Sequence, residues 1–195
     1  MKFYSIKDEV RVLGVDDGPF KRGDADVLVV GVVFRGGNWM DGVLSMRVAV
    51  DGLDATDKLV SLVKGCRFKD LRVVMLDGIA FGGFNVVDIN RLYSETKLPV
   101  IVVTRDKPDF KEIKAALKNL PDSEVRWGYM RDAGEPKPVE VKDGKLVYIQ
   151  TAGIKFTDAE AIVKLSATRS LIPEPIRVAH LIAQGVVSGE SKGKA

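Results

Sequence analysis

The stretch LRVVMLDGIAFGGFN (residues 71–85) is the most informative part of the chain for its fold. It opens with an apolar, β-branched run, which predicts a buried strand over residues 71–76. That strand ends in Asp77-Gly78, and a glycine-rich segment follows. The segment matches neither GxGxxG nor GxxxxGK[ST], so the sequence does not support a dinucleotide-binding or a P-loop site.

The glycine-rich segment has two interpretations. Backbone N–H groups at Gly82 and Gly83 could contact a phosphate of a nucleic acid, because the segment lies between a strand and a helix. Alternatively, both glycines form a tight turn that packs closely, and Asn85 caps the helix that follows.

Three further strands are predicted upstream of this stretch. Gly- and Asp-containing turns connect them without any helical pattern, which indicates an antiparallel meander. These strands cover residues 10–15, 27–34 and 43–50. A helix then follows, capped by Asp54 or Thr56 and ending near residue 64.

Downstream, helices and strands alternate, which gives the order βββ-αβαβα and predicts an α/β fold. The predicted elements are a helix near 86–94, a strand at 100–104 and a helix at 111–119, followed by a strand-like segment at 125–130, a turn-rich segment at 134–144, a strand at 146–149 and helices at 157–168 and 173–184. We expect one domain over residues 1–187 and a disordered tail over residues 188–195.

Two apolar strands each end in a carboxylate, one at Asp16 and one at Asp77. Strands joined by helical crossovers run parallel, and functional groups gather at their carboxyl ends. If these strands are neighbours, the two carboxylates meet and would require a cation between them, for which oxygen ligands favour Mg²⁺ or Mn²⁺. Asp-Gly pairs are also common turn formers, so a local structural role is the alternative.

The composition excludes several classes of protein. The chain has 195 residues, and its 30 basic and 27 acidic side chains leave a net charge of only +3. Nucleic-acid binding would therefore need a local basic patch. Cys66 and His180 are the single cysteine and the single histidine, which excludes internal disulfides and multi-histidine or multi-cysteine zinc sites.

The location of the protein is also predicted from the sequence. Residues 1–10 carry charges in place of an apolar signal core, and no segment approaches the roughly 20 apolar residues that a membrane helix needs. We therefore expect a cytoplasmic protein without a membrane partner. Its oligomeric state stays open.

The segment IPEPIRVAHLIAQ (residues 172–184) predicts a packed helix that starts at a rigid Pro-Glu-Pro sequence. Glu174 lies in its first turn, where the helix dipole favours an acid. Arg177 and His180 are one turn apart on a more polar face. A lone histidine on such a helix is more often a structural hydrogen-bonding partner than a catalyst.

With this order of elements and the strand-terminal aspartates, the chain resembles proteins of the ribonuclease H-type fold, and several segments resemble the endonuclease V family. The segments are GVD (14–16), VVMLDG (73–78), LPVIVVTR (98–105) and, as the most specific match, IPEPIRVAH (172–180). Within this superfamily it looks closest to an uncharacterised, largely archaeal branch that carries a domain of unknown function. The resemblance implies a mixed sheet with helices on both faces plus C-terminal helices.

The resemblance also implies chemistry. Endonuclease V cleaves deoxyinosine-containing DNA or inosine-containing RNA with Mg²⁺ held by strand-borne carboxylates. By this resemblance, Asp16 and Asp77 are catalytic and metal-binding residues. Arg105 matches a basic residue after the next strand that can steady a phosphate, and Lys107 is a further candidate for nucleic-acid binding.

The chain departs from the family pattern at several positions. The spacing of the family's third carboxylate falls here on Thr56, so Asp54 is the preferred catalytic and metal-binding substitute, with a helix-capping role as the alternative. The family's Gly-His pair reads Gly153-Ile154, and Asp158 downstream is a further candidate metal ligand. Residues 42–56 lack the family's aromatic wedge, and Gly82-Gly83-Phe84 replaces its His-Pro-Arg. Inosine recognition is therefore not expected to carry over.

Two hypotheses of function follow. The first is a metal-dependent phosphodiesterase that acts on DNA or RNA, in which Asp54 or Asp158 completes the cluster. The second is a non-catalytic nucleic-acid-binding or complex-forming module, in which Arg105, Lys107 and neighbouring lysines contact phosphates. A small-molecule hydrolase on the same fold is a further alternative, since fold alone does not define function.

Overall fold

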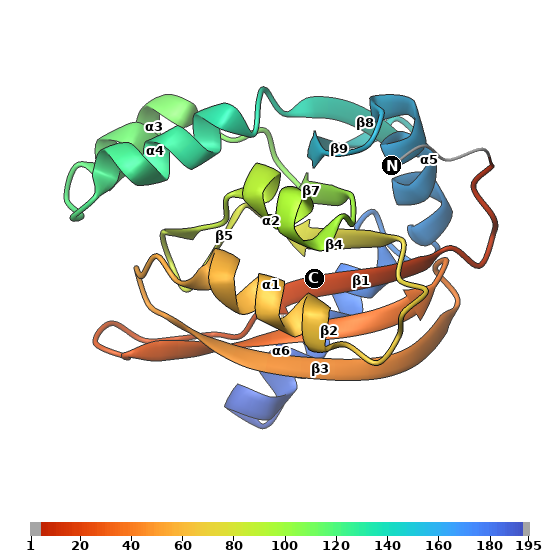
Figure 1. Ribbon diagram of the computed structural model, residues 1–195, viewed down its shortest axis with the longest axis horizontal. Coiled ribbons are helices and arrows are strands. Elements are labelled where there is room, and N and C mark those ends of the chain that lie inside the picture. Colours follow the sequence, from red (N-terminus) through yellow and green to blue (C-terminus); the bar gives the residue numbers. More distant parts are fainter. Residues whose placement is uncertain (1–4, 193–195) are drawn as a thin grey trace.

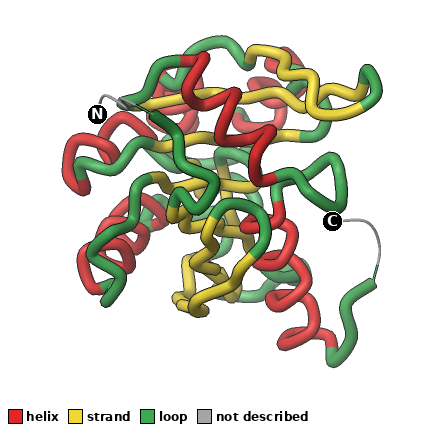
Figure 2. The backbone as a smooth tube through the Cα atoms, turned by 90° about the vertical axis from the view of Figure 1, so that its right-hand side faces the viewer, coloured by secondary structure: helices red, strands yellow, loops and turns green. Residues whose placement is uncertain are grey.

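A mixed β-sheet forms the centre of the protein. The computed structural model describes residues 5–192, in which a seven-stranded sheet is covered by helices on both faces (Figures 1 and 2). The strand order is β3-β2-β1-β4-β7-β9-β8. These strands are β1 (Arg11–Asp17), β2 (Asp26–Arg35), β3 (Trp39–Ala49), β4 (Val73–Asp77), β7 (Val100–Thr104), β8 (Lys137–Lys142) and β9 (Lys145–Ala152). The predicted ribonuclease H-like mixed sheet with helices on both faces is confirmed.

The directions of the strands determine which strand ends meet. β1, β2 and β3 form the predicted antiparallel meander. β1 pairs in parallel with β4, and β4 pairs in parallel with β7, so the carboxyl ends of these three strands lie at one edge of the sheet. β9 runs antiparallel to β7 and carries the outer strand β8.

The two faces of the sheet are covered by different helices. On one face, α1 (Ala55–Gly65) and α2 (Ile89–Thr96) pack against residues such as Leu13 and Val15. On the other face, α5 (Phe156–Ser166) and α6 (Glu174–Ser188) pack against Val12, Val73 and the strands around them. Successive residues of a strand point to opposite faces, so Asp16 of β1 points to the α6 face.

A close approach of α6 to β1 explains the glycine at position 14. A Cβ atom at Gly14 would lie 2.2 Å from the backbone carbon of Pro175, well inside van der Waals contact. Only glycine therefore lets the start of α6 lie directly on β1. This contact carries the rest of α6 across the end of the strand.

The structure corrects the prediction of a strand over residues 125–130. This segment belongs to α4 (Ser123–Asp132), which lies beside α3 (Phe110–Leu117) and projects from the body of the protein (Figure 1). Val125, Trp127 and Tyr129 alternate as in a strand, but Arg126 and Met130 are buried at a helical spacing of four residues. The helical period therefore determines the structure of this segment.

A strand was also missed in the turn-rich segment. Lys137–Lys142 forms β8, where Pro138 is the register partner of Tyr148. Proline lacks a backbone N–H, and it is tolerated here because β8 is an outer strand with one free side. Pro138 therefore lies in an edge strand, and Pro136 comes just before that strand begins.

Buried Arg126 ties α4 to two loops. Its exposed fraction is 2%, and its guanidinium group donates to four backbone carbonyl oxygens. The acceptors belong to Pro121, Gly52, Phe84 and Asp51. A buried cation is tolerated only when its hydrogen-bonding capacity is used, so this side chain fixes the loop before α1 and the glycine-rich segment in one arrangement.

The ends of the chain lie partly outside the description. Residues 1–4 and 193–195 are outside the described residues, so the predictions for the N-terminal segment and for the last part of the tail concern positions that the structure does not describe. The predicted tail starts at Ser188, which is the last residue of α6, and Gly189 follows in a left-handed conformation. Among residues 5–192, no helix is long and apolar enough to cross a membrane.

Candidate metal and nucleic-acid site

Two carboxylates lie side by side where β1 and β4 end. Val15 is the register partner of Leu76, so the next residues, Asp16 and Asp77, are neighbours across the sheet. Adjacent strands lie about 4.8 Å apart. Both side chains point to the α6 face, because they alternate with residues that pack under α1 and α2. The condition for the two carboxylates to meet, that β1 and β4 are neighbouring strands, is therefore fulfilled.

His180 of α6 reaches this pair of carboxylates. Its Nδ1 lies 2.8 Å from Oδ2 of Asp16. The histidine is half-buried, whereas Asp16 is buried with an exposed fraction of 5%. A hydrogen bond of this kind fixes both the ring and the carboxylate. His180 is therefore a hydrogen-bonding partner, as expected, but its partner is a candidate metal ligand.

The surroundings of the site disfavour the ionised form of both carboxyl groups. Burial, together with the charge of Asp16, raises the pKa of Asp77 to about 7, although His180 and Arg105 work against this shift. Burial also raises the pKa of Asp16, opposed by its bond to His180. The bond to Asp16 raises the pKa of His180 above its usual value. Buried acids that need a positive charge are typical of functional sites.

Asp17 is the next residue of β1 and points to the opposite face. Its Oδ2 accepts a hydrogen bond from the Gly82 N–H at 2.7 Å. Burial raises its pKa to about 6 in spite of this bond. The contact fastens the glycine-rich segment to the end of β1.

The glycine-rich segment forms a tight turn between the short strands β5 (Ala80–Phe81) and β6 (Asn85–Val86). Gly82 and Gly83 have φ angles of +54° and +85°, a region that favours glycine. Because the Gly82 N–H is already donated to Asp17, it has no free hydrogen for a phosphate. The tight-turn interpretation describes what the structure shows.

A depression opens over the carboxylates on the α6 face. Its volume is about 440 Å³, within the range of about 300–1,000 Å³ that small-ligand sites occupy. The residues that line it come from the ends of β1 and β4, from the turn after β1 and from α6. They are Asp16, Asp17, Gly18, Pro19, Phe20, Asp77, His180 and Gln184.

Arg105 and Lys107 follow β7 at the same edge of the sheet. Both are exposed, and Arg105 is close enough to Asp77 to lower its pKa. A cationic side chain beside the carboxyl end of β4 can contact a phosphate that approaches the site. The structure thus places Arg105 with the Asp16–Asp77 pair.

Asp54 takes part in a structural hydrogen-bond network instead of joining the Asp16–Asp77 pair. Its Oδ1 accepts hydrogen bonds from the Ala49 N–H at 3.1 Å and from Nδ2 of Asn85 at 2.6 Å. Oδ1 of Asn85 in turn accepts from the Ala55 N–H, at the start of α1. The expectation that Asn85 caps the following helix is wrong, since Asp88 caps α2 by accepting from the Arg91 N–H.

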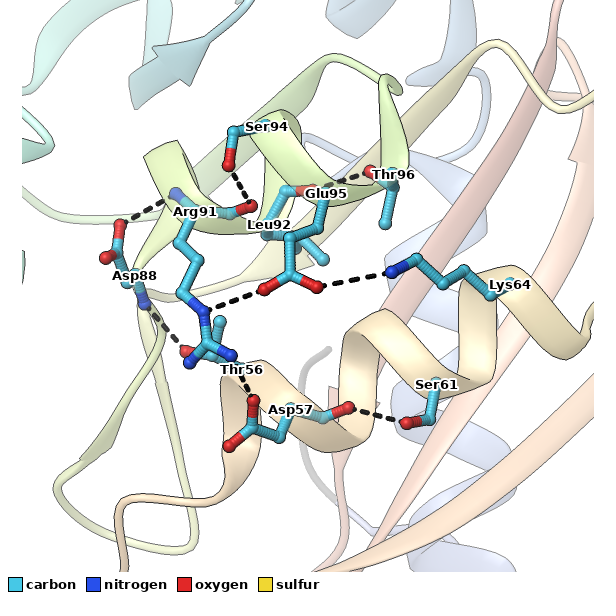
Figure 3. Close-up of polar contacts among 10 residues, drawn as sticks. All are labelled: Thr56, Asp57, Ser61, Lys64, Asp88, Arg91, Leu92, Ser94, Glu95 and Thr96. Carbon is cyan, nitrogen blue, oxygen red and sulfur yellow. Dashed lines mark hydrogen bonds and ion pairs between the residues drawn. The ribbon is translucent and has the colours of Figure 1, made fainter.

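The position expected for the third carboxylate lies between α1 and α2. Figure 3 shows Thr56, whose Oγ1 accepts from the Asp88 N–H at 3.0 Å. The neighbouring Asp57 pairs with Arg91, which also contacts Glu95. These contacts fasten the two helices together, and neither side chain reaches Asp16.

Asp158 lies at the opposite edge of the sheet. The end of β9 pairs with the beginning of β7, since Ala152 is the register partner of Val100, and α5 starts four residues later. Asp77 and Asp16 lie at the other end of these strands. The structure therefore does not bring Asp158 to the pair, and the expectation that it completes the cluster is corrected. Within residues 5–192, no three His, Cys, Asp or Glu side chains are grouped to hold a metal ion.

The role of His180 can be tested by nuclear magnetic resonance, because the chain contains a single histidine. In tag-free protein, the imidazole signal is expected to titrate above the ordinary value of 6.5, since ionised Asp16 stabilises the imidazolium. The stability that this bond gives is present below pH 6.5 and is lost as the pH rises through the folded-state pKa. In Asp16→Asn the midpoint should fall toward 6.5. An unchanged midpoint would contradict the assigned contact.

Solved structures of endonuclease V share the fold of this chain. Endonuclease V from Streptomyces avermitilis superposes with a TM-score of 0.61 at 15% identity, over 92% of this chain and 82% of that one. Endonuclease V from Ciona intestinalis, in complex with an inosine-containing DNA, gives 0.58 at 18% identity, over 87% and 82%. The chain thus has the ribonuclease H-like fold of the endonuclease V class.

The comparison with sequence families is more specific. The chain belongs to the Endonuclease dU family, whose model matches residues 8–187. A "UPF0215 protein" from Methanosarcina acetivorans is 54% identical over 98% of both chains. A protein of unknown function from Archaeoglobus fulgidus superposes with a TM-score of 0.82 at 43% identity, covering 91% of this chain and 98% of that chain.

Proposed function

We propose that this protein is a metal-dependent endonuclease that acts on DNA or RNA at the Asp16–Asp77 pair. The observation that carries the proposal is the pair of neighbouring strand-end carboxylates, one buried and one partly buried, whose pKa values are raised. Family membership supports it, because the matching family is described as Endonuclease dU.

The residues present fit a hard divalent cation. Mg²⁺ is commonly bound by only one or two carboxylates, with water and substrate phosphate as its other ligands, and two carboxylates are what the site offers. A bound cation would also offset the burial and the charge of Asp16, which together raise the pKa of Asp77. When bound, Mg²⁺ or Mn²⁺ activates water and stabilises the leaving oxygen in phosphodiester hydrolysis.

The protein's own residues have separable roles in this proposal. Asp16 and Asp77 bind the cation, and His180 holds the Asp16 carboxylate in one orientation through the 2.8 Å contact. Arg105 steadies the phosphate at the same edge. The other ring nitrogen of His180, Nε2, would hold or release a proton during the reaction, which is a common role of a histidine beside a reacting phosphate.

A second candidate function is a nucleic-acid-binding module without catalysis. The observation that favours it is the engagement of Asp54 in the network with Ala49 and Asn85, which removes the preferred third carboxylate from the pair. Under this alternative the protein binds nucleic acid through its exposed basic residues and never cleaves it.

Metal titration distinguishes the two candidates. Isothermal titration with Mn²⁺ should show binding by the wild-type protein that Asp16→Asn abolishes, and binding should weaken as the pH falls below about 7, since protons compete for Asp77. A parallel screen tests inosine-, uracil- and mismatch-containing DNA and RNA with Mn²⁺. If the wild-type protein binds nucleic acid but neither Mn²⁺ nor Mg²⁺, the endonuclease proposal fails and the non-catalytic binding module is supported.

A further inference from the structure

The turn between β1 and β2 places an aromatic ring beside the carboxylates. Phe20 lines the same depression as Asp16, Asp77 and His180. Its exposed fraction is 40%, and it joins none of the buried apolar clusters found among the described residues. An aromatic side chain that leaves two fifths of its surface exposed in such a depression offers an apolar face to a ligand.

The backbone of this turn is held at both ends. The Gly18 N–H donates to the Leu28 carbonyl at 2.8 Å, and the Lys21 N–H donates to Oδ2 of Asp24 at 2.7 Å. Pro19 restricts the backbone directly before the ring. The turn therefore presents Phe20 from an ordered backbone.

The residues after the ring are basic. Lys21 and Arg22 are exposed, and neither side chain forms an ion pair with another residue in the described part of the chain. The floor of the depression carries carboxylates that repel phosphate. Cations directly after Phe20 in the chain would offset this repulsion for a polyanionic strand that approaches the depression.

We propose that Phe20 stacks on an unpaired base of a nucleic-acid strand, next to the phosphate at Asp16 and Asp77, while Lys21 and Arg22 contact flanking phosphates. This inference rests on the proposed function, since it describes how the same site holds its substrate. Stacking on an aromatic side chain strengthens binding by about 5- to 150-fold per base. The substrate class is therefore a single strand or an unpaired nucleotide.

The test is the affinity for a fluorescent single-stranded oligonucleotide, measured by anisotropy in EDTA and again with Mn²⁺. We expect Phe20→Ala and Phe20→Leu to weaken binding about 10-fold or more, because both remove the aromatic face. Phe20→Trp should bind about as well as the wild-type protein. The thermal melts of these variants should match, since the ring packs on no buried cluster.

Trp39→Ala is the matched control. Trp39 is an aromatic residue with an exposed fraction of 62%, and it pairs with Arg35 at the opposite edge of the sheet. Its replacement should leave the affinity unchanged. The double variant Lys21→Ala/Arg22→Ala should lower the slope of log affinity against log salt by about 0.7 per lost phosphate contact.

Each outcome separates the inference from the proposed function. If the wild-type protein binds no nucleic acid with or without Mn²⁺, both fail. If the wild-type protein binds and Phe20→Ala binds equally well, only the inference is overturned. If Phe20→Ala keeps its affinity but changes a dimer to a monomer in sedimentation, the inference is overturned and the turn forms a protein interface instead.

Discussion

Replacing Asp16 or Asp77 by Asn is expected to reduce the rate of metal-dependent cleavage by about 10³-fold or more. Metal ions contribute several kcal/mol of transition-state stabilisation, and each 1.36 kcal/mol changes the rate about tenfold. The amide keeps the shape of the carboxylate but supplies no negative charge to the cation. The measurement is single-turnover cleavage of labelled oligonucleotides with Mn²⁺, on the substrate that the screen identifies.

The matched control is Asp57→Asn, because Asp57 is an exposed carboxylate that pairs with Arg91 away from the pair. This variant should cleave within about twofold of the wild-type rate, as expected for the loss of a surface ion pair. The wild-type rate should rise with pH up to about 7, since Asp77 must lose its proton. Unchanged cleavage by both Asn variants would exclude the assigned site.

Asp54→Asn addresses the third carboxylate directly. The contacts of Asp54 with the Ala49 N–H and Asn85 indicate a structural role. We therefore expect a loss of stability that is larger than the loss of cleavage measured on the folded fraction. If Asp54→Asn loses as much cleavage activity as Asp16→Asn and melts at the normal temperature, Asp54 is a catalytic residue after all.

The second large effect is on stability. Asp77→Asn should raise the free energy of unfolding of the metal-free protein at pH 8 by up to about 4 kcal/mol. The pKa of Asp77 is raised from 3.8 to about 7 by burial and by Asp16, and each unit corresponds to about 1.4 kcal/mol. The variant removes a buried charge that the wild-type protein must carry at this pH.

The pH dependence of the free energy of unfolding shows why Asp77→Asn should be more stable than the wild-type protein. Between about pH 4 and pH 7 the folded wild-type protein keeps the Asp77 proton that the unfolded chain has already released. The stability of the wild-type protein therefore falls as the pH rises through this window. The variant lacks this fall, so the two proteins should differ less than half as much at pH 5 as at pH 8, where the difference is largest.

Thermal melts at both pH values provide the measurement. A change of 1 kcal/mol moves Tm by about 2–4 °C in a chain of this size. Added Mn²⁺ should stabilise the wild-type protein but not Asp77→Asn, because ligand binding to the folded state adds to its stability. A variant that is less stable than the wild-type protein at pH 8 without metal would show that the carboxylate is not under electrostatic strain.

Much of the fold follows from local sequence patterns. The order of strands and helices was predictable because β-branched runs and helical spacing report which residues are buried. The errors came from segments with mixed signals. Residues 125–130 alternate like a strand, but buried Arg126 needs four carbonyl acceptors that only distant loops supply. The strand β8 was missed because Pro138 argues against a strand, and the sequence does not show that β8 is an outer strand, where proline is tolerated.

The residues at which the strands end can be recognised in the sequence, and they include Asp16 and Asp77. Which other groups join this pair depends on how the elements pack. Close packing at Gly14 brings α6 onto β1 and carries His180 to Asp16, 164 residues away. The strand directions place Asp158 at the far edge of the sheet. Spacing along a chain describes neighbours within one element, whereas a site at the ends of several strands depends on how those elements pack.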